Sequence, residues 1–526
     1  MTPIPGVPAI IAHARSGALD HAWRLFHESG LDTAVSDPAA LSLKGRLIKD
    51  QAAGAAPAER RRLFLEAAAA YGAAGEISGA TYPLINAASL ALLAGDSDQA
   101  RERARRLLSR LEASGDDPDE TPYYAMATRA EALLLVGEAA RARTTLEAAV
   151  ALAPRAWGDH ASTLRQFALI LAELGEDAAW LEPLRPPRVL HFGGGMGLGG
   201  DPDGAIAAWL AEHRIGFGYG ALAAGADILI AEALVAAGAQ LHVVLPCPVE
   251  AFRAVSVAPY GGDWEARFEA LLERCDSRHV AGSGCPSGGG PIEAASLQLA
   301  AEAAMGRAVM QAAILATDAL QLLVTGERLP KVGEPGGSAW MGRHWRENGR
   351  VGDALVLRDR DAGPAGDGLA TPCRLTAVAW LEPADGPLDR DRVERLAAAA
   401  GGAEGRWTQQ GLLLRFDETG AAASRILTVL AELGEVVRVG AAYDLAEIVD
   451  DPFGGGRLTL GPAADLAARA ARSAPPGAAH VTGDFAAALM AGPAAGRPRV
   501  ELVGEMTDTG IEDPVQLYAL RSAPLR

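Results

Sequence analysis

The first third of the chain places apolar residues three and four positions apart, with short Gly or Asp turns between them and almost no β-branched runs. This spacing is typical of amphipathic helices, so we predict an all-α domain over residues 1–183. Within it, a turn glycine stands five residues before a small alanine three times. These pairs are Gly17 with Ala22, Gly95 with Ala100, and Gly137 with Ala142. Such a recurrence indicates repeated helical hairpins.

The third copy continues with Leu146, Ala149 and Pro154 and resembles the tetratricopeptide pattern, in which small residues let paired helices approach and proline ends the second helix. A plain helical bundle with coincidental alanines is the alternative. Residues 81–95 and 127–137 also resemble the TRAF-binding helical repeats of certain mitogen-activated kinase kinase kinases. That resemblance implies contact with a protein partner through the helical repeats.

The pattern changes after Pro186 and Pro187, which end the helical array. Short apolar runs then alternate with helical periods, which predicts βαβ units and a Rossmann-like parallel sheet over residues 187–358. The expected strands are 189–192, 215–219, 240–245, 320–325 and 354–357. The expected helices are 221–237, 264–275, 292–315 and 338–347. A segment rich in Gly, Pro and Asp, residues 359–372, is typical of a linker.

Residues 373–526 alternate strands and helices in another order. The expected strands are 374–381, 411–416, 436–443, 500–503 and 515–520, and the expected helices are 388–400, 419–433 and 462–473. Adjacent strands separated only by turns favour an α+β sandwich. The whole chain is therefore predicted to be multidomain.

Composition and charge narrow the function classes. Apolar residues make up 49% of the chain and the formal net charge is -18, so the summed field repels polyphosphate backbones and anionic lipid surfaces. We expect no nucleic-acid partner and no membrane association. Four cysteines without CxxC spacing fit the reducing cytoplasm. Histidines are isolated, so no metal site is predicted, and no cofactor is expected apart from a nucleotide-like ligand.

The strongest local chemical signal is a strand that runs directly into a glycine-rich turn at Gly193, Gly194 and Gly195. Glycine lets main-chain N–H groups approach a phosphate without obstruction by a Cβ atom. Two more glycine turns follow expected strands. The predicted ligand residues from all three are Gly193, Gly194, Gly195, Gly218, Tyr219, Gly220, Asp227, Glu232, Gly336, Gly337 and Ser338. The simpler alternative is that the glycines only fill tight turns. The chain has neither a P-loop lysine nor a GxGxxG fingerprint.

Residues 218–234 and 241–246 resemble the Rossmann-like SLOG group, whose members bind, sense or hydrolyse nucleotides and their derivatives. The group's phosphoribohydrolases carry a Gly-Gly-x-Gly-Thr turn before a Glu-bearing helix. Gly336, Gly337 and Ser338 stand roughly at that turn, but the following Thr and Glu are missing. The resemblance therefore implies a nucleotide-like ligand and argues against hydrolase activity.

The last 150 or so residues resemble a class III adenylate/guanylate cyclase homology domain, which implies a ferredoxin-like α+β fold and a homodimer. The likeness rests on residues 375–382, 411–416, 437–443, 451–453, 465–477 and 481–486. Such cyclases use two carboxylates to hold two divalent ions. Those positions are Glu382 and Gln410 here, and the positions that orient ribose and stabilise the transition state are Asp465 and Arg469. A neutral amide cannot replace a carboxylate, so we predict a degenerate site, that is, a pseudoenzyme.

Three functional hypotheses remain open from the sequence. The first is a cytoplasmic signalling or sensor protein that binds a nucleotide-like ligand in the parallel-sheet domain. The second is a hydrolase that cleaves a nucleotide or its N-glycosidic bond, with Asp227 or Glu232 as the acid–base group, or a residually active cyclase. The third is a scaffold without ligands. Glu131 and Asp318 are interpreted as caps or solvated positions.

Overall fold

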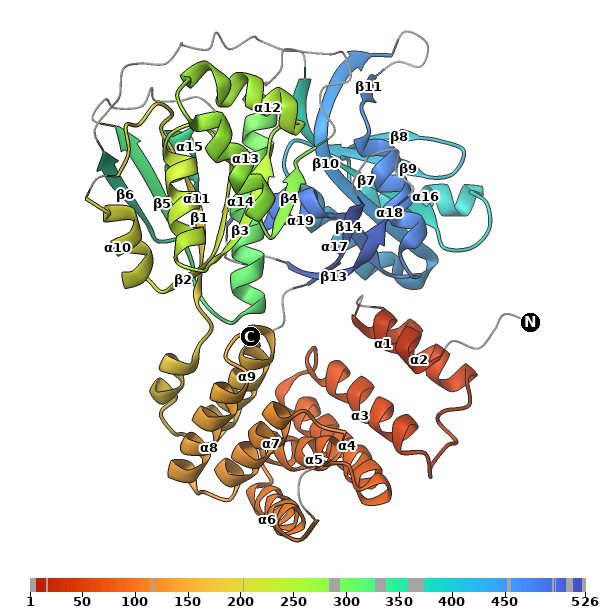
Figure 1. The fold of residues 1–526 in the computed structure, drawn as a ribbon. Coiled ribbons are helices and arrows are strands. Elements are labelled where there is room, and N and C mark those ends of the chain that lie inside the picture. The colour runs from red at the N-terminus through yellow and green to blue at the C-terminus, as the bar shows by residue number, and fades with distance from the viewer. Residues whose placement is uncertain are drawn as a thin grey trace. The chain divides into compact units, whose positions relative to one another are not determined.

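The computed structural model describes residues 6–15, 18–114, 117, 119–201, 203–282, 294–326, 337–357, 373–451, 456–493, 496, 498–507 and 514–522 (Figure 1). Its contacts divide the chain into two compact units. The first consists mainly of residues 1–186 and is called the repeat unit. The second consists of residues 187–313 and 317–523 and contains two β-sheets.

The repeat unit is built from helices packed in sequence order, which confirms the prediction of a helical N-terminal region with repeats. Its helices are α1 (Val7–Arg15), α2 (Leu19–Glu28), α3 (Pro38–Ala52), α4 (Pro57–Ser78), α5 (Thr81–Leu93), α6 (Ser97–Ser114), α7 (Pro122–Leu135), α8 (Ala139–Leu152), α9 (Trp157–Leu174) and the 3₁₀ helix η1 (Ala179–Leu184). Helices α3 and α4, α5 and α6, and α7 and α8 pack as neighbouring pairs.

The glycine–alanine pairs found in the sequence lie at the turns of these hairpins. Gly95 and Gly137 follow α5 and α7 with φ of 90° each, in the left-handed region that favours glycine. Ala100 and Ala142 lie on the next helices and are completely buried. Small side chains at these points let the paired helices approach closely. Gly17 lies outside the described residues, while its partner Ala22 is buried.

The second unit begins with a six-stranded parallel sheet, here called the parallel-sheet lobe. Its strands are β1 (Arg188–Gly194), β2 (Ile215–Gly220), β3 (Gln240–Leu245), β4 (Ser277–Val280), β5 (Ala319–Gly326) and β6 (Gly352–Leu357), in the order β4-β3-β2-β1-β5-β6. Its helices are α10 (Ala205–Glu212), α11 (Ala226–Ala236), α12 (Val249–Ser256), α13 (Trp264–Arg274), α14 (Ala294–Ile314) and α15 (Ser338–Glu347), with the short η2 (Ala258–Tyr260). The order reverses direction between β1 and β5, which is where open α/β sheets usually leave a crevice.

The lobe differs from the sequence prediction in several details, including helices α10 and α12, which were not predicted. Strand β4 was not predicted, because Ser277–Val280 is a polar and mostly exposed edge strand without the apolar run of a buried one. The helix expected over 221–237 begins only at Ala226. Residues just before it bond to the loop after β1 instead: Gly197 donates to the carbonyl of Ala224, and Ala226 donates to that of Gly195.

The C-terminal lobe contains an eight-stranded sheet with parallel and antiparallel pairs, which is consistent with the α+β architecture predicted for this segment. Its strands are β7 (Cys373–Pro383), β8 (Glu404–Trp407), β9 (Leu412–Phe416), β10 (Val437–Asp450), β11 (Arg457–Leu460), β12 (Ala479–Thr482), β13 (Arg499–Met506) and β14 (Val515–Arg521), in the order β13-β14-β12-β10-β7-β9-β8, with β11 paired to β10. Its helices are α16 (Arg390–Ala400), α17 (Thr419–Leu433), α18 (Ala463–Ser473) and α19 (Gly483–Ala491), with the short η3 (Gly434–Val436). One face of the sheet packs with α16, α17 and α19, and the opposite face packs with α18.

The two lobes share one hydrophobic core. Helix α14 of the parallel-sheet lobe contributes Leu299, Ala303 and Met305 to the cluster that also contains the α16, α17 and α19 face of the C-terminal sheet. Gly306 lies so close to α19 that an added Cβ atom would come within 1.8 Å of the Ala487 carbonyl oxygen. The linker predicted over residues 359–372 stays a prediction. By their contacts, the parallel-sheet lobe and the C-terminal lobe on either side of it belong to one compact unit.

Polar contacts fix the same junction. Arg350 donates to the carbonyl oxygens of Met490, Ala491 and Gly492, at 2.6, 2.6 and 2.8 Å. These carbonyls lie at the C-terminal end of α19, where positive charge is favourable. Asp484 accepts from His279 at 2.6 Å and lies 3.7 Å from Arg307. Burial alone would raise the pKa of Asp484, but these two partners lower it to about 2.

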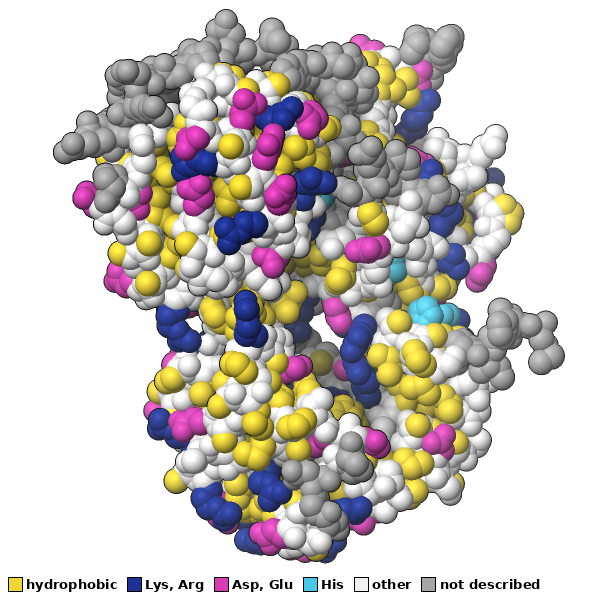
Figure 2. Space-filling model, in the orientation of Figure 1, with side chains coloured by type: hydrophobic (Ala, Val, Ile, Leu, Met, Phe, Trp, Pro, Cys, Tyr) yellow, Lys and Arg dark blue, Asp and Glu magenta, His cyan; other side chains and the backbone are white. Residues whose placement is uncertain are grey.

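None of the helices in the described part of the chain is long and apolar enough to cross a bilayer. On the face seen in Figure 2, basic and acidic side chains alternate over the parallel-sheet lobe. Ion pairs of this lobe include those of Arg253 with Glu250 and Glu269, and of Arg267 with Glu232.

Candidate functional site

The glycine turns after β1 and β2 meet at the carboxyl edge of the parallel sheet. Met196 and Gly225 form an isolated β-bridge, and the amide of Gly195 donates to the carbonyl of Val324 on β5 at 2.8 Å. The turn after β1 is therefore bonded on both sides, to the segment before α11 and to β5. Gly337 and Ser338 begin α15, after β5. Gly336 lies outside the described residues.

Asp227 occupies the centre of this edge. Its Oδ2 atom accepts from the amide of Ala223 at 3.1 Å. Burial raises the pKa of Asp227 to about 7, although hydrogen bonds from the amides of Ala223 and Gly194 act in the opposite direction. The main-chain donors that the sequence assigned to a ligand phosphate are thus partly satisfied by a carboxyl group of the chain itself.

Several of the predicted glycines have a packing role in this structure. An added Cβ atom would lie 2.0 Å from the Val324 carbonyl oxygen at Gly194, 2.2 Å from the Leu234 Cδ1 atom at Gly218, and 2.6 Å from Phe192 at Gly220. At Gly193 the nearest atom would be the flexible end of Met341, at 3.0 Å, and at Gly195 no atom would be closer than 3.8 Å. Of these five glycines, Gly195 therefore has the most space beside it, although its own amide and carbonyl are already hydrogen-bonded to Val324 and Ala226.

The structure does not bring Tyr219 and Glu232 into this edge as free groups. Tyr219 is buried and its ring stacks on His242 with a centroid distance of 4.4 Å. Glu232 accepts two hydrogen bonds from Arg267 of α13, at 2.7 and 2.6 Å. A carboxylate held in this bidentate way is poorly placed to serve as an acid–base group.

The four positions taken from the cyclase resemblance lie at one end of the C-terminal sheet and on α18. Glu382 accepts from the indole Nε1 of Trp380 at 3.0 Å. Gln410 lies in the turn before β9, where its main-chain N–H donates to Thr408 Oγ1 at 3.2 Å. On α18, Arg469 donates to Asp465 at 2.6 Å.

Helix α18 packs on the sheet face that carries Val378 and Trp380. An apolar cluster therefore lies beside the side chain of Glu382. In the part of the chain that the structure describes, no three His, Cys, Asp or Glu side chains gather closely enough to hold a metal ion. As arranged, Glu382 and Gln410 offer one carboxylate and one amide.

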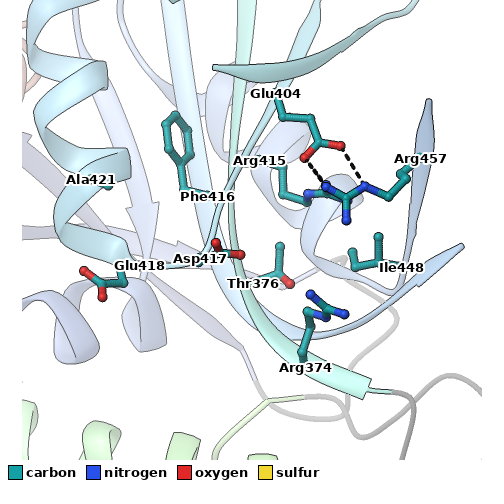
Figure 3. A pocket seen from close by; sticks show the side chains of 10 residues that line it. All are labelled: Arg374, Thr376, Glu404, Arg415, Phe416, Asp417, Glu418, Ala421, Ile448 and Arg457. Atoms are coloured by element: carbon teal, nitrogen blue, oxygen red, sulfur yellow. Dashed lines mark hydrogen bonds and ion pairs between the residues drawn. The ribbon is translucent and has the colours of Figure 1, made fainter. Parts of the chain in front are cut away.

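A second site in the C-terminal lobe was not predicted from the sequence. Glu404 of β8 pairs with Arg415 of the neighbouring strand β9 and with Arg457 of β11, the latter at 3.0 Å (Figure 3). The second of these ion pairs connects β8 to β11. Arg406 of β8 also pairs with Asp451 at 2.7 Å, just after β10. We call these contacts the β8–β11 clasp.

The clasp borders a cavity of about 540 Å³. Its walls carry Arg374, Arg415 and Arg457, together with Thr376, Phe416 and the first turn of α17. Although partial burial acts in the opposite direction, the bonds to Arg415 and Arg457 lower the pKa of Glu404. Glu404 therefore stays ionised. We call this space the arginine pocket.

The position of Glu131 corrects the sequence interpretation of a cap or solvated residue. Glu131 lies in the middle of α7, where its carboxylate accepts from Ser89 Oγ at 2.5 Å and from Gln166 Nε2 at 3.1 Å. Although the residue as a whole keeps some exposure, burial of its carboxyl group raises its pKa, and the charge of Lys49 opposes this shift. Lys49, Ser89, Glu131 and Gln166 lie on α3, α5, α7 and α9. Their interactions with Glu131 therefore connect consecutive parts of the repeat unit.

Residues 9–91 match the model of the family described as Tetratricopeptide Repeats-Sensor. The match covers α2 to α4, together with most of α1 and α5, and includes the first glycine–alanine pair found in the sequence. It spans less than half of the chain. No curated protein matches the sequence.

Solved structures that are similar to part of this chain include nucleotide cyclases. An adenylate cyclase from Trypanosoma brucei has 16% identity and a TM-score of 0.24, covering 30% of this chain and 92% of that one. The adenylyl cyclase CyaB from P. aeruginosa has 12% identity and a TM-score of 0.25, covering 30% and 100%. The guanylate cyclase domain of RhGC from Catenaria anguillulae, in complex with GTP, has 13% identity and a TM-score of 0.23, covering 28% and 96%.

Proposed function

We propose that this chain is a signalling protein that senses a small ligand and does not synthesise a cyclic nucleotide. The repeat unit, which matches a family named for sensing, supports a role in recognition. In this proposal the helical repeats bind a protein partner, as the TRAF-binding likeness of residues 81–95 and 127–137 implies. The protein acts in the cytoplasm, and the C-terminal lobe is a pseudocyclase that takes part in homodimer formation.

The observation that carries the proposal is that the two metal-binding positions of the cyclase resemblance hold only one carboxylate, Glu382, and a neutral amide, Gln410. Two-metal chemistry needs carboxylates that hold both ions, lower the pKa of the attacking hydroxyl and neutralise the leaving pyrophosphate. Here the Glu382 carboxylate accepts from the Trp380 indole, and Gln410 has no charge. Arg469 is paired with Asp465, so its charge is already compensated.

Incubation of the full chain with ATP or GTP and Mn²⁺ is expected to give no cyclic nucleotide above the level of a sample with excess chelator. The Glu382→Gln variant is the matched control, because it removes the last carboxylate at the two metal positions. We expect wild type and variant to be indistinguishable by chromatography of the products. Cyclic AMP or cyclic GMP that disappears in Glu382→Gln would contradict the pseudocyclase assignment.

The ligand sensed by the parallel-sheet lobe is proposed to be nucleotide-like, as in the SLOG group. Because Asp227 already accepts from main-chain amides of the glycine turns, recognition there relies on the space beside Gly195, where an added Cβ atom would meet no atom closer than 3.8 Å, more than on a phosphate grip. Thermal-shift measurements with a set of nucleotides test this: stabilisation by at least one of them is expected. A set without any stabilising nucleotide contradicts this ligand class.

One observation favours the second candidate, a hydrolase that uses Asp227. Burial raises the pKa of this carboxyl to about 7, which suits a general acid or base at neutral pH. Glu232 is the weaker choice, because Arg267 holds it as a paired carboxylate. Release of a free base or phosphate from a nucleotide, detected by chromatography and abolished in Asp227→Asn, would establish turnover and overturn the sensor-only function.

A further inference from the structure

The arginine pocket lies far from the positions inherited from the cyclase resemblance. Arg374 and Glu382 are eight positions apart on the same strand, β7, which is roughly 26 Å at about 3.3 Å per residue. Arg374 and Thr376 face the pocket, whereas Glu382 contacts Trp380 near the opposite strand end. The pocket is therefore a separate site of the same lobe.

The ion pairs of Glu404 with Arg415 and Arg457 border the pocket, and the pair with Arg457 joins strands that are far apart in the sequence. Five strands in the order β11-β10-β7-β9-β8 form its wall, and the β8–β11 clasp joins the two outer ones. The Arg415 side chain is only 10% exposed, so its charge is held inside the wall by Glu404. A volume of about 540 Å³ falls within the usual range of roughly 300–1,000 Å³ for small-molecule sites.

The charges of the pocket are arranged asymmetrically. Figure 3 shows the three arginine side chains on one side and the carboxyl groups of Asp417 and Glu418 on the other. Glu404 compensates Arg415 and Arg457, whereas no acidic side chain in the described part of the chain pairs with Arg374. Arg374 thus brings an uncompensated guanidinium to the cavity, and its fork of donors matches a phosphate group.

The opposite wall limits how much negative charge a ligand can carry. Asp417 and Glu418 repel a long phosphate chain, but they accept hydrogen bonds from hydroxyl or amino groups. Phe416 offers an apolar surface between the two sides. A ligand with one phosphate, a hydroxylated or amino-bearing body and moderate size satisfies all three conditions.

We propose that the arginine pocket binds a small phosphomonoester, such as a nucleoside monophosphate or a sugar phosphate, with the phosphate on Arg374 and the polar body toward Asp417 and Glu418. This goes beyond the proposed function, because it places a second ligand site in the C-terminal lobe, away from Glu382 and Gln410. Binding here needs no metal ion. It is expected to weaken with salt, since the attraction is an ion pair at a partly open site.

Calorimetric titration of the full chain with AMP and with ribose 5-phosphate tests the proposal. Adenosine and ribose are the uncharged controls, and ATP is the polyphosphate control. We expect at least one of the two phosphomonoesters to bind at this site, its uncharged partner not to bind there, and ATP to bind there at least tenfold more weakly than that phosphomonoester. Absence of binding by both phosphomonoesters overturns the proposal.

Variants assign the binding to the pocket. Arg374→Ala is expected to reduce the affinity at least tenfold, and Arg374→Lys to give an intermediate loss, because lysine keeps the charge without the fork. Arg390→Ala, on exposed α16, is the matched control for loss of one arginine and should leave the affinity unchanged. If AMP binds Arg374→Ala as tightly as wild type, it occupies another site. That result rejects the arginine pocket while leaving the nucleotide-like ligand of the parallel-sheet lobe intact.

Discussion

Gly306→Ala is expected to destabilise the junction of the two lobes by about 3 kcal/mol, a value at the upper end of the usual cost of overpacking. The added methyl group would lie 1.8 Å from the Ala487 carbonyl oxygen and 2.7 Å from the Ala487 Cα atom. Both contacts are with backbone, which cannot rotate away as a side chain could. Either α14 or α19 has to shift, and with it the core that both lobes share. Hydrogen exchange of the α14 and α19 amides measures the loss directly.

Gly420→Ala provides the matched control for this substitution. Gly420 lies in the first turn of α17, and an added Cβ atom there would meet nothing within 4 Å. Alanine is the better helix former by about 1 kcal/mol, so this variant is expected to be slightly more stable than wild type. Equal effects of the two substitutions would show that the close approach of α14 and α19 does not exist in solution.

The second large effect concerns Asp227 and pH. Its folded-state pKa of about 7 lies above the ordinary value of 3.8, so the protonated form is the one that folding favours. The stabilisation by protonated Asp227 is complete below the ordinary pKa of 3.8, and it is lost as the pH rises through the folded-state pKa of about 7. Two pH units at about 1.4 kcal/mol each predict a loss of about 3 kcal/mol between pH 5 and pH 8 from this residue.

Urea unfolding of wild type and Asp227→Asn at pH 5 and pH 8 measures this loss. Asparagine does not titrate, so the difference between the two proteins should shift in favour of the variant by about 3 kcal/mol from pH 5 to pH 8. The absolute stability of the variant depends also on how its amide meets the Ala223 and Gly194 amides. Asp318→Asn, at an exposed position in the same lobe, is the matched control for replacing an aspartate with asparagine. A constant difference across the range would mean that Asp227 titrates normally.

The helices and parallel strands of this chain could be predicted because they are encoded locally. Glycine and proline mark the ends of elements, and the apolar spacing switches between helical and strand periods at the Pro186–Pro187 boundary. Short apolar elements were missed, namely helices α10 and α19 and the buried strand β12, and so were polar strands. Strand β4 is a polar edge strand, and β8 carries Glu404 and Arg406, so neither has the pattern of a buried strand.

The candidate site could be predicted only in part, because its contacts depend on residues far apart in sequence. The approach of the turn after β1 to the segment after β2 follows from the parallel sheet, but its bridge is at Gly225, which was expected inside the helix 221–237. That Asp227 accepts amides of those turns, and that Glu131 bonds to Ser89 and Gln166, depends on packing between elements.

The arginine pocket was missed for the same reason: Glu404 and Arg415 meet only when β8 pairs with β9, and Arg457 comes from β11, more than 40 residues later in the chain. One local signal was available. Arg415 interrupts the otherwise apolar run at 412–416, and a charged residue in a buried strand usually has a partner or a ligand.

The β8–β11 clasp also bears on how copies of this protein can associate. An open sheet edge offers unpaired N–H and C=O groups to a strand of another molecule, and proteins commonly protect such edges with short strands and charged side chains. Strands β8 and β11 are short, and their arginine and glutamate side chains are tied across the sheet. Growth of the sheet by strand addition is therefore disfavoured at this end. A copy that added a strand to this sheet would have to use its other edge, at β13, and the clasp protects the β8 edge from edge-to-edge aggregation.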